Sequence, residues 1–510
     1  MRPSSLLALA ALSISAVTHA QDGLLDPSFS TDGMVIYDAE GNEENGVDIA
    51  VRSDGKLWVL GNSYSTQEKI LLMRFNTDGT LDNTFFGDGV QELSQGVGNT
   101  FSSCMELQAD GSLFIGGYYI DELGSTSPLV IKVDANGNSV PGFGSNGFAL
   151  GSNDGYRVTD LGVQSSGTIV VTLGPLSEIN PAVCAVSSTG VFAEPLVQLQ
   201  CSLFDRLTAL QVQSDDRVLV TGYRGTDNGS NWVALILALE PDLTGDLDFS
   251  PGYICGQFNI ETQGVEYYDS GNPLFFTNDT GNDIAVLNNG DIMVAGTTID
   301  TTGNADVYRT SLLKVHDDNS VDASFGLQGW IKPYVGSFFK RLLVQANDKV
   351  LALGGDFSNT IALARFDTDG TLDPTFGDLG GFTHTAIGSF STNPGGMAVQ
   401  ADGRILVVGT AVNNDNDVVV VRYDGSVVGL DEPKNNGYML VHPNPTAGSF
   451  TVAVPQGVQR IIITDALGHI VQQRTLNGNV NANFQIGTPG VYQTTSIGAG
   501  GQLVQRVVVL

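Results

Sequence analysis

Ser53-Asp54-Gly55-Lys56-Leu57-Trp58-Val59-Leu60-Gly61 is one of seven similar stretches in this chain, and together they decide the fold. Each is a turn followed by an alternating apolar strand that usually ends in glycine. The other six are Ala109 to Gly117, Ser165 to Leu173, Ser214 to Gly222, Asn288 to Gly296, Ala346 to Gly354 and Ala401 to Gly409. Successive anchors at positions 55, 111, 167, 216, 290, 348 and 403 are 56, 56, 49, 74, 58 and 55 residues apart. This period is typical of a four-stranded propeller blade. The sequence therefore predicts an all-β fold, a seven-bladed β-propeller over residues 21–429.

The ends of the chain differ from the repeats. Residues 1–20 have a basic start and a short apolar core, and small residues lead to a cleavage point between Ala20 and Gln21, as in a signal peptide. Residues 430–437 are a polar linker, and residues 438–510 read as a small C-terminal β-sandwich. No later apolar run is long enough for a membrane helix. We expect an exported protein with no transmembrane segment.

The charge balance limits the classes of partner. There are 23 basic and 55 acidic residues, giving a net charge of −32. Such a surface repels phosphate backbones, so we expect no nucleic-acid partner. We expect a monomer.

Four cysteines, Cys104, Cys184, Cys201 and Cys255, are free to pair in an exported protein. Their spacing leaves two, one or no disulfide bridges open. No two cysteines are close in the sequence and no histidine lies near them, so the spacing does not indicate a zinc site.

Successive repeats are linked by a junction of the form Leu-Asp…Phe-Gly, as in Leu81 to Gly87 and Leu372 to Gly377. The repeat is cut within a junction at both ends of the propeller region, which predicts how the ring closes. The repeat region begins with Leu25-Asp26-Pro27-Ser28-Phe29 and the strand Met34 to Tyr37, which we take as the first strand of the first unit. The last repeat motif ends near Tyr423. Pairing of the early strand with the strands around Gly403 to Tyr423 would remove the free sheet edges.

Antiparallel strands divide the connections between two faces. The Asp-Gly turns and the Leu-Asp…Phe-Gly junctions share one, the uniform face; the variable loops share the other, the irregular face. Variable loops on a rigid scaffold are where binding sites are usually built, although loops also vary where nothing binds. Aromatic residues here suit sugar stacking or protein anchoring. The candidate ligand-binding residues are Tyr118, Tyr119, Tyr223, Trp232, Tyr267, Tyr268, Phe338 and Phe339.

Acidic residues in two junctions have spacings loosely like calcium loops. The candidates are Asp78, Asp82, Asp367, Asp369 and Asp373. The glutamate that closes an EF-hand loop is absent, and Asp and Gly also favour tight turns. The turn interpretation is therefore the simpler one. We expect no obligatory cofactor, with Ca²⁺ as the one cation these residues suit.

Catalytic motifs find little support, and we predict no catalytic residues. The propeller region holds only His316 and His384, in separate repeats, and no Gly-x-Ser-x-Gly elbow occurs. A carboxylate pair near the axis, acting on a glycan as acid and base, is the enzymatic alternative.

The repeats resemble the delta-60 repeat, a propeller-forming unit of bacterial secreted proteins. The pattern is carried by Arg74-Phe75 and Arg365-Phe366 and by Gln108, Gln164, Gln213, Gln345 and Gln400. It departs at Arg52 and Leu287, where the glutamine is missing, and at Asp216 and Asp348, where the turn glycine is missing. The resemblance spans roughly residues 24–429 and implies architecture only.

The last 73 residues resemble the C-terminal sorting domain of type IX secretion, found in Bacteroidetes. The matching residues, in order, are Pro443, Asn444, Pro445, Gly448, Asp465, Gly468, Gly490 and Tyr492, followed by the terminal Val507-Val508-Val509-Leu510. The resemblance implies passage across the outer membrane by the type IX machinery, and then release or attachment at the cell surface.

Together these observations predict a secreted or cell-surface propeller that is a non-enzymatic binding or adhesion module for a protein or glycan. A secreted polysaccharide hydrolase or lyase is the alternative from another class. A structural surface component is the third.

Overall fold

The computed structural model describes residues 22–39, 41–152, 155–176, 180–194, 197–198, 205–226, 231–246, 249, 265–268, 277–302, 305–356, 360–387, 391–413, 415–425, 440–442, 448–454, 458–465, 469–476, 481–498 and 501–509. Contacts divide the chain into two units, Met1–Ser426 and Val427–Leu510. The predicted signal peptide, with Ala20 and Gln21, lies outside the described residues.

The described part of the first unit forms seven four-stranded antiparallel sheets. The first three are β2 (Glu43–Val51), β3 (Leu57–Tyr64), β4 (Glu68–Phe75) and β5 (Val90–Leu93); β6 (Asn99–Leu107), β7 (Leu113–Ile120), β8 (Thr126–Val133) and β9 (Phe148–Leu150); and β10 (Tyr156–Val163), β11 (Ile169–Pro175), β12 (Ala182–Val186) and β13 (Val197–Gln198). The next three are β14 (Arg206–Val212), β15 (Val218–Thr226), β16 (Asn231–Leu239) and β17 (Val265–Tyr268); β18 (Thr277–Val286), β19 (Ile292–Thr302), β20 (Ala305–Val315) and β21 (Trp330–Ile331); and β22 (Phe338–Val344), β23 (Val350–Gly355), β24 (Ile361–Phe366) and β25 (Phe382–Thr385). The last is β26 (Ser391–Val399), β27 (Ile405–Val412), β28 (Asn416–Tyr423) and β1 (Met34–Tyr37).

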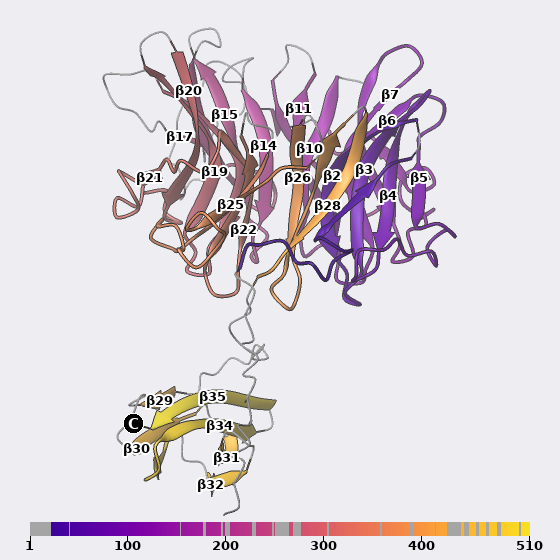
Figure 1. The fold of residues 1–510 in the computed structure, drawn as a ribbon. Helices are drawn as coiled ribbons and strands as arrows, with labels where there is room; N and C mark the ends of the chain where they lie inside the picture. The colour runs from indigo at the N-terminus through magenta and orange to yellow at the C-terminus, as the bar shows by residue number, and fades with distance from the viewer. Residues whose placement is uncertain are drawn as a thin grey trace, which may run out of the picture. The chain divides into compact units, whose positions relative to one another are not determined.

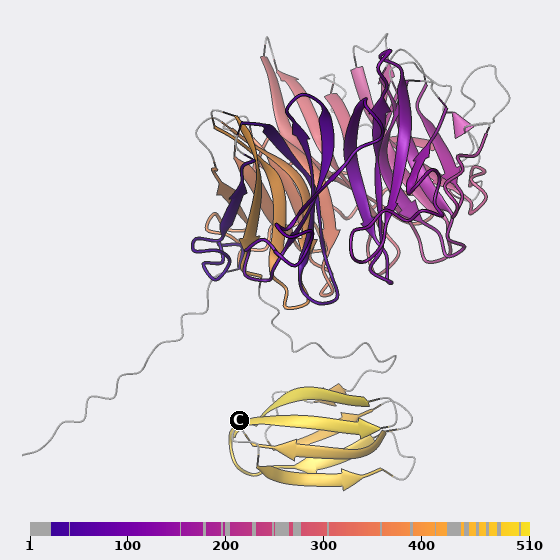
Figure 2. The same ribbon diagram turned by 90° about the vertical axis from the view of Figure 1, so that its right-hand side faces the viewer.

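The sheets are arranged as a ring. The innermost strands β2, β6, β10, β14, β18, β22 and β26 contact one another in succession, and β26 contacts β2 again. Figure 1 shows β26 and β28, in orange, beside β2 and β3, in indigo, and Figure 2 shows the sheets from the side. The apolar core lies between neighbouring sheets, where Trp58 is fully buried. The all-β propeller prediction is confirmed.

Strand β1 closes the ring. It pairs antiparallel with β28, with Met34 opposite Val421 and Tyr37 opposite Val418. The predicted pairing with the end of the last repeat is therefore confirmed. The assignment of β1 to the first unit is wrong, because the junction that precedes β1 belongs to the last sheet, and β1 is that sheet's outermost strand.

A cation, an aspartate and a phenylalanine fasten each of four junctions, and we call this group the clasp. In the first sheet, Arg74 Nε lies 2.6 Å from Asp82 Oδ2, and the guanidinium lies 4.7 Å from the Phe85 ring centre. Asp82 is nearly fully buried. The other three clasps are Lys314–Asp322–Phe325, Arg365–Asp373–Phe376 and Arg422–Asp26–Phe29.

The clasp of the last sheet joins the two ends of the propeller chain. Asp26 and Phe29 come from the N-terminal junction and Arg422 from β28, and the ion-pair distance is 2.7 Å. Arg404 adds a second cation to Asp26 at 2.8 Å. Burial alone would raise the pKa of Asp26, but hydrogen bonds from Ser28 and the charges of Arg422 and Arg404 hold it below its usual value.

Residues that depart from the repeat pattern keep its geometry. Asp216 and Asp348 stand where the other turns have glycine, and they adopt φ values of 70° and 64°, close to the 80° of Gly55. Aspartate tolerates this left-handed conformation better than most residues, so the turns survive. Gln164 donates to the Pro241 carbonyl of the next sheet at 2.8 Å, and Arg52, in the glutamine position, reaches the matching carbonyl of Ala135 at 2.8 Å.

The second unit has two sheets around one apolar core. They are β29 (Leu440–His442), β30 (Ser449–Ala453) and β33 (Asn481–Gln485); and β32 (Ile470–Thr475), β31 (Val458–Thr464), β34 (Gly490–Gly498) and β35 (Gly501–Val509). Phe450, Ile461, Phe484 and Val507 lie in the core.

Cys104 and Cys184 are buried thiols, whereas Cys201 and Cys255 lie outside the described residues. Within the described residues, no helix has the length and hydropathy needed to cross a membrane.

Breaking the closing clasp is expected to destabilise the ring. Asp26→Asn removes the carboxylate that neutralises two arginines, one of them buried, so the free energy of unfolding should fall by about 3 kcal/mol. Asp402→Asn is the matched control, since Asp402 pairs with the same Arg404 at the exposed surface, and should cost less than about 1 kcal/mol. Urea unfolding followed by tryptophan fluorescence measures both. Equal losses in the two variants would contradict the role of the clasp.

Candidate functional site

A bulge at one level of every innermost strand organises the inner part of the propeller. The pairing with the second strand shifts at Gly46/Asp48, Ser102/Cys104, Val158/Asp160, Leu207/Ala209, Gly281/Asp283, Phe339/Arg341 and Pro394/Met397. A bulge bends the strand and redirects the side chains beside it. Two groups of side chains therefore recur around the axis, one on each side of this level.

Three aspartates after the bulges bind backbone groups of the next sheet. Asp48 Oδ2 accepts a hydrogen bond from Met105 N at 3.0 Å, Asp160 Oδ2 one from Leu210 N at 2.8 Å, and Asp283 Oδ2 one from Leu342 N at 2.6 Å. In each case Oδ1 accepts from the following residue of its own strand. These carboxylates hold successive sheets together, and the same geometry occurs in three sheets.

The same aspartates lie in one electrostatic cluster with Glu106, Lys340 and Arg341. Burial raises the pKa of Asp160 to about 7, partly offset by Arg341. The side chain of Glu106 is exposed, but the surrounding chain reduces the hydration of its carboxyl group. This desolvation, together with the charges of Asp160 and Asp48, raises the pKa of Glu106 to about 7. Burial and Arg341 lower the pKa of Lys340 to about 8. The axis therefore carries groups that can exchange protons near neutral pH.

Two aromatic pairs and an arginine lie on the irregular side of the bulges in three consecutive sheets. Phe101 and Tyr118 are a cross-strand pair whose rings stack 4.5 Å apart with planes 9° apart. Arg157 occupies the same register position in the next sheet, and its charge acts on Tyr118. Arg206, which pairs with Tyr223, acts on that residue first, and Arg157 adds to the effect. Tyr223 then contacts Trp232, with ring centres 5.4 Å apart. We use the name aromatic belt for Phe101, Tyr118, Arg157, Tyr223 and Trp232.

The belt includes three of the eight aromatic residues predicted from sequence: Tyr118, Tyr223 and Trp232. Tyr119, near the end of β7, and Phe338, at the start of β22, are half-buried, and both lie toward the irregular face. The prediction for Phe339 is wrong, because the strand alternation turns this residue into the core, where it is fully buried against Phe366. Tyr267 and Tyr268 form part of β17, and their side chains lie outside the described residues.

Phe101, Arg157 and Glu106 were missed by sequence reasoning, because the search was confined to loop aromatics. Phe101 and Arg157 each lie one residue before a bulge, and this relation appears only when the strands are paired in the fold. Other exposed side chains extend the irregular face. Leu123 is 91% exposed and Tyr334 78%, and Arg309 lies 4.4 Å from the Tyr334 ring centre.

The five calcium candidates lie in turns on the uniform face. Asp82 and Asp373 are buried in clasps, where Lys56 and Lys349 add further cations. Lys349 also binds Asp367 at 2.8 Å. Asp78 and Asp369 are exposed and accept hydrogen bonds from Thr80 and Thr371 within their turns. These contacts account for the acidic residues as turn and clasp components.

A hollow of about 1220 Å³ also lies on the uniform face. It is lined by turns of the last, first and second sheets and by Arg52, Arg404 and Arg422. All three arginines are engaged in ion pairs or backbone hydrogen bonds of the repeat. The hollow is therefore built from framework residues.

The sorting residues of the second unit are partly described. Gly448 has φ of 113° and its carbonyl accepts a hydrogen bond from Ile486 N. Asp465 Oδ1 accepts from His469 N, and the Tyr492 hydroxyl donates to the Thr488 carbonyl. Gly490 begins β34. Pro443, Asn444, Pro445 and Gly468 lie outside the described residues.

Comparison with protein families gives a match in each of the two units. A β-propeller domain of unknown function, DUF5122, matches residues 52–85, 108–139, 345–376 and 400–426. A secretion system C-terminal sorting domain matches residues 440–510. The chain thus carries DUF5122 propeller repeats and a type IX secretion sorting domain, and it is a secreted protein of the cell surface. No curated protein matches the sequence.

Solved structures with similar folds are distant in sequence. The extracellular domain of a hybrid two-component system from B. thetaiotaomicron is 12% identical, with a TM-score of 0.36; the match covers 94% of this chain and 57% of that one. PorZ, a surface component of the type IX secretion system of Porphyromonas gingivalis, is 12% identical, with a TM-score of 0.34 and coverages of 89% and 68%. A PL25 ulvan lyase is 10% identical, with a TM-score of 0.43 and coverages of 77% and 96%.

The axial carboxylates predict how stability depends on pH. A carboxyl group with a raised pKa in the folded state keeps a proton that the unfolded chain releases between about pH 4 and 7, so its contribution disfavours folding as pH rises through this window. The melting temperature of Glu106→Gln should fall less between pH 5 and 8 than that of the wild type. Asp110→Asn is the control, and its melting temperature should change with pH as that of the wild type does. Hydrogen bonds from Ser112 lower the pKa of Asp110, so this group is ionised throughout the range. Calorimetry giving the same slope for Glu106→Gln and wild type would contradict this.

Proposed function

We propose that this secreted propeller is a non-enzymatic recognition module that binds a glycan at the cell surface through the aromatic belt. The observation that carries the proposal is the sequence of groups along the belt: a stacked aromatic pair, an exposed arginine and a second aromatic pair, on three consecutive sheets. Aromatic faces suit the apolar faces of sugar rings, and their rigidity makes ordering inexpensive in entropy.

The arginine adds a preference within glycans. Arg157 lies close enough to act on the hydroxyl groups of both Tyr118 and Tyr223. A guanidinium binds a carboxylate through two parallel hydrogen bonds. In a chain of net charge −32, this local cation favours oligosaccharides in which a uronate alternates with neutral sugars over densely charged polymers.

The framework supports recognition because hydrogen bonds between sheets hold the strands of the belt in place. Asp48 of the first sheet binds Met105 N in the strand of Phe101, and Asp160, in the strand of Arg157, binds Leu210 N in the sheet of Tyr223. Side chains held by a rigid framework lose little freedom on binding.

A glycan array containing neutral and uronate oligosaccharides tests the proposal with the purified full chain. Tyr118→Ala should weaken binding at least about tenfold, because it removes one face of the stacked pair. Arg157→Ala should reduce binding of uronate oligosaccharides more than that of neutral ones. Tyr64→Ala, at an exposed tyrosine of the irregular face outside the belt, should bind as the wild type does. Binding that is unchanged in both belt variants would exclude the belt as the site.

A secreted polysaccharide hydrolase or lyase is the second candidate function, and one observation favours it. Glu106 and Asp160 have pKa values raised to about 7 in the same axial cluster as Lys340. Groups that titrate near the working pH are efficient proton donors and acceptors. Under this alternative the array supernatants contain cleaved oligosaccharides with the wild type and none with Glu106→Gln. The recognition proposal expects binding without cleavage.

A further inference from the structure

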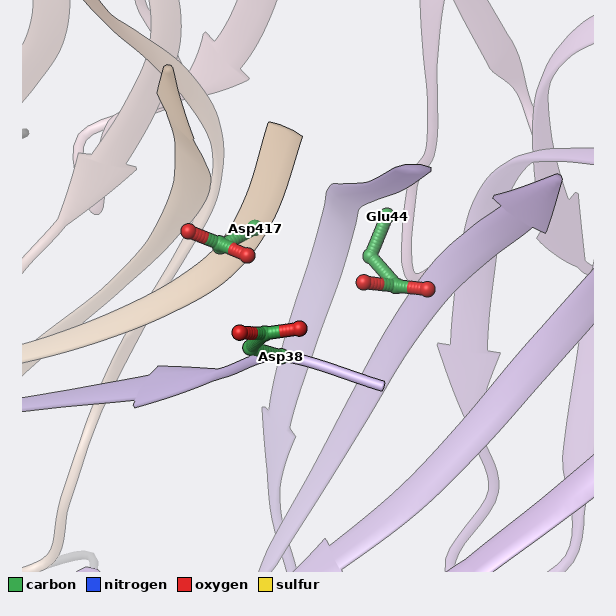
Figure 3. A group of neighbouring side chains, drawn as sticks. All are labelled: Asp38, Glu44 and Asp417. Atoms are coloured by element: carbon green, nitrogen blue, oxygen red, sulfur yellow. The ribbon is translucent and has the colours of Figure 1, made fainter. Parts of the chain in front are cut away.

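Three carboxylates meet where the ring closes, away from the belt and the axial cluster. Asp38 follows β1, Glu44 lies at the start of β2, and Asp417 lies at the start of β28 (Figure 3). One oxygen from each lies within 4.8 Å of the other two. Asp38 and Asp417 are 379 residues apart in the sequence, so only ring closure brings this group together.

Two of the three carboxylates are buried. Glu44 is fully buried and Asp417 is 4% exposed. Glu44 is oriented by Ala39 N at 3.3 Å and by the Ser63 hydroxyl at 3.1 Å, and Asn413 Nδ2 donates to Asp417 Oδ2 at 3.0 Å. The second oxygen of Asp417, Oδ1, is buried without any hydrogen-bond partner within the described part of the chain. Buried carboxylate oxygens are almost always paired, so this atom indicates a missing partner.

The surrounding charges make the deficit larger. Burial raises the pKa of Glu44, and the carboxylates of Asp38 and Asp417 raise it further. Burial also raises the pKa of Asp417, and Asp38 and Asp415 add to this effect. The charged groups that act on the buried pair are therefore further acids. A cation between the three would neutralise them.

We propose that Asp38, Glu44 and Asp417 form a calcium site that ties the N-terminal strand to the first and last sheets. Calcium takes carboxylate oxygens at about 2.3–2.6 Å, so two ligands on opposite sides of the ion lie up to about 5 Å apart. Separations of no more than 4.8 Å lie within this range. Magnesium binds at about 2.0–2.1 Å, which requires a tighter group. Bound calcium would connect β1, β2 and β28, which meet only in the closed ring.

Thermal melting and titration calorimetry of the purified full chain, treated with chelator, test the site. Added Ca²⁺ should raise the melting temperature and give a saturable binding heat, and Mg²⁺ should do so more weakly. In Asp417→Asn the affinity for Ca²⁺ should fall at least about tenfold. Without calcium this variant should melt no lower than the wild type, because it loses a buried, uncompensated charge.

The paired control Asp78→Asn/Asp369→Asn removes exposed turn acids of the uniform face and should keep the full calcium response. Glu44→Gln provides a second variant of the site and should lose it. Absence of a binding heat in the wild type at millimolar Ca²⁺ would overturn the proposal. A response that persists in Asp417→Asn and Glu44→Gln but disappears in the control would overturn it too, and an equal response to Mg²⁺ would overturn the assignment to calcium.

Discussion

The structure of the propeller depends on one buried ion pair, between Arg422 of β28 and Asp26 of the N-terminal junction. In other sheets the matching pair, such as Arg74–Asp82, fastens a junction to a strand of its own repeat. In the last sheet it joins segments 396 residues apart and thereby positions β1 on β28. The phenylalanine that covers the guanidinium keeps water away, so the pair acts at reduced dielectric and its partners must both be present.

Inside the ring, a second repeated device holds the sheets at a common level. The carboxylates of Asp48, Asp160 and Asp283 bridge alternate sheet interfaces, and the half-buried Arg341 offsets part of their charge. This arrangement brings ionisable groups to the axis for a structural reason. It also fixes the strand positions from which Phe101, Arg157 and Tyr223 project, so the proposed recognition site and the framework share the same bulges.

Most of the fold could be predicted from the sequence because each repeat contains its own turn and junction motifs. The Asp-Gly turn and the Leu-Asp…Phe-Gly junction have the same length in most repeats, and the truncated junction at Asp26 predicted the closure. The residues of the candidate site were harder to predict from the sequence. Phe339 follows Phe338 in a strand, and a pattern of two aromatics does not show which one faces the core. Phe101 and Arg157 can be placed at equivalent positions only when strands from different repeats are set in register. Asp38, Glu44 and Asp417 have no common spacing signal, because they belong to different repeats.

The position of β1 has a consequence for the order of folding. Its partner β28 lies at the other end of the propeller sequence, so this sheet has a much longer loop to close than any sheet made from a single repeat. Six sheets can form as the chain becomes available, but the seventh must wait until residue 423 has arrived. Until β1 pairs with it, β28 has an open edge and Arg422 is uncovered. The final step of assembly is thus the capture of the chain's own beginning, and a chain that stops short of this strand remains an open arc with two exposed edges.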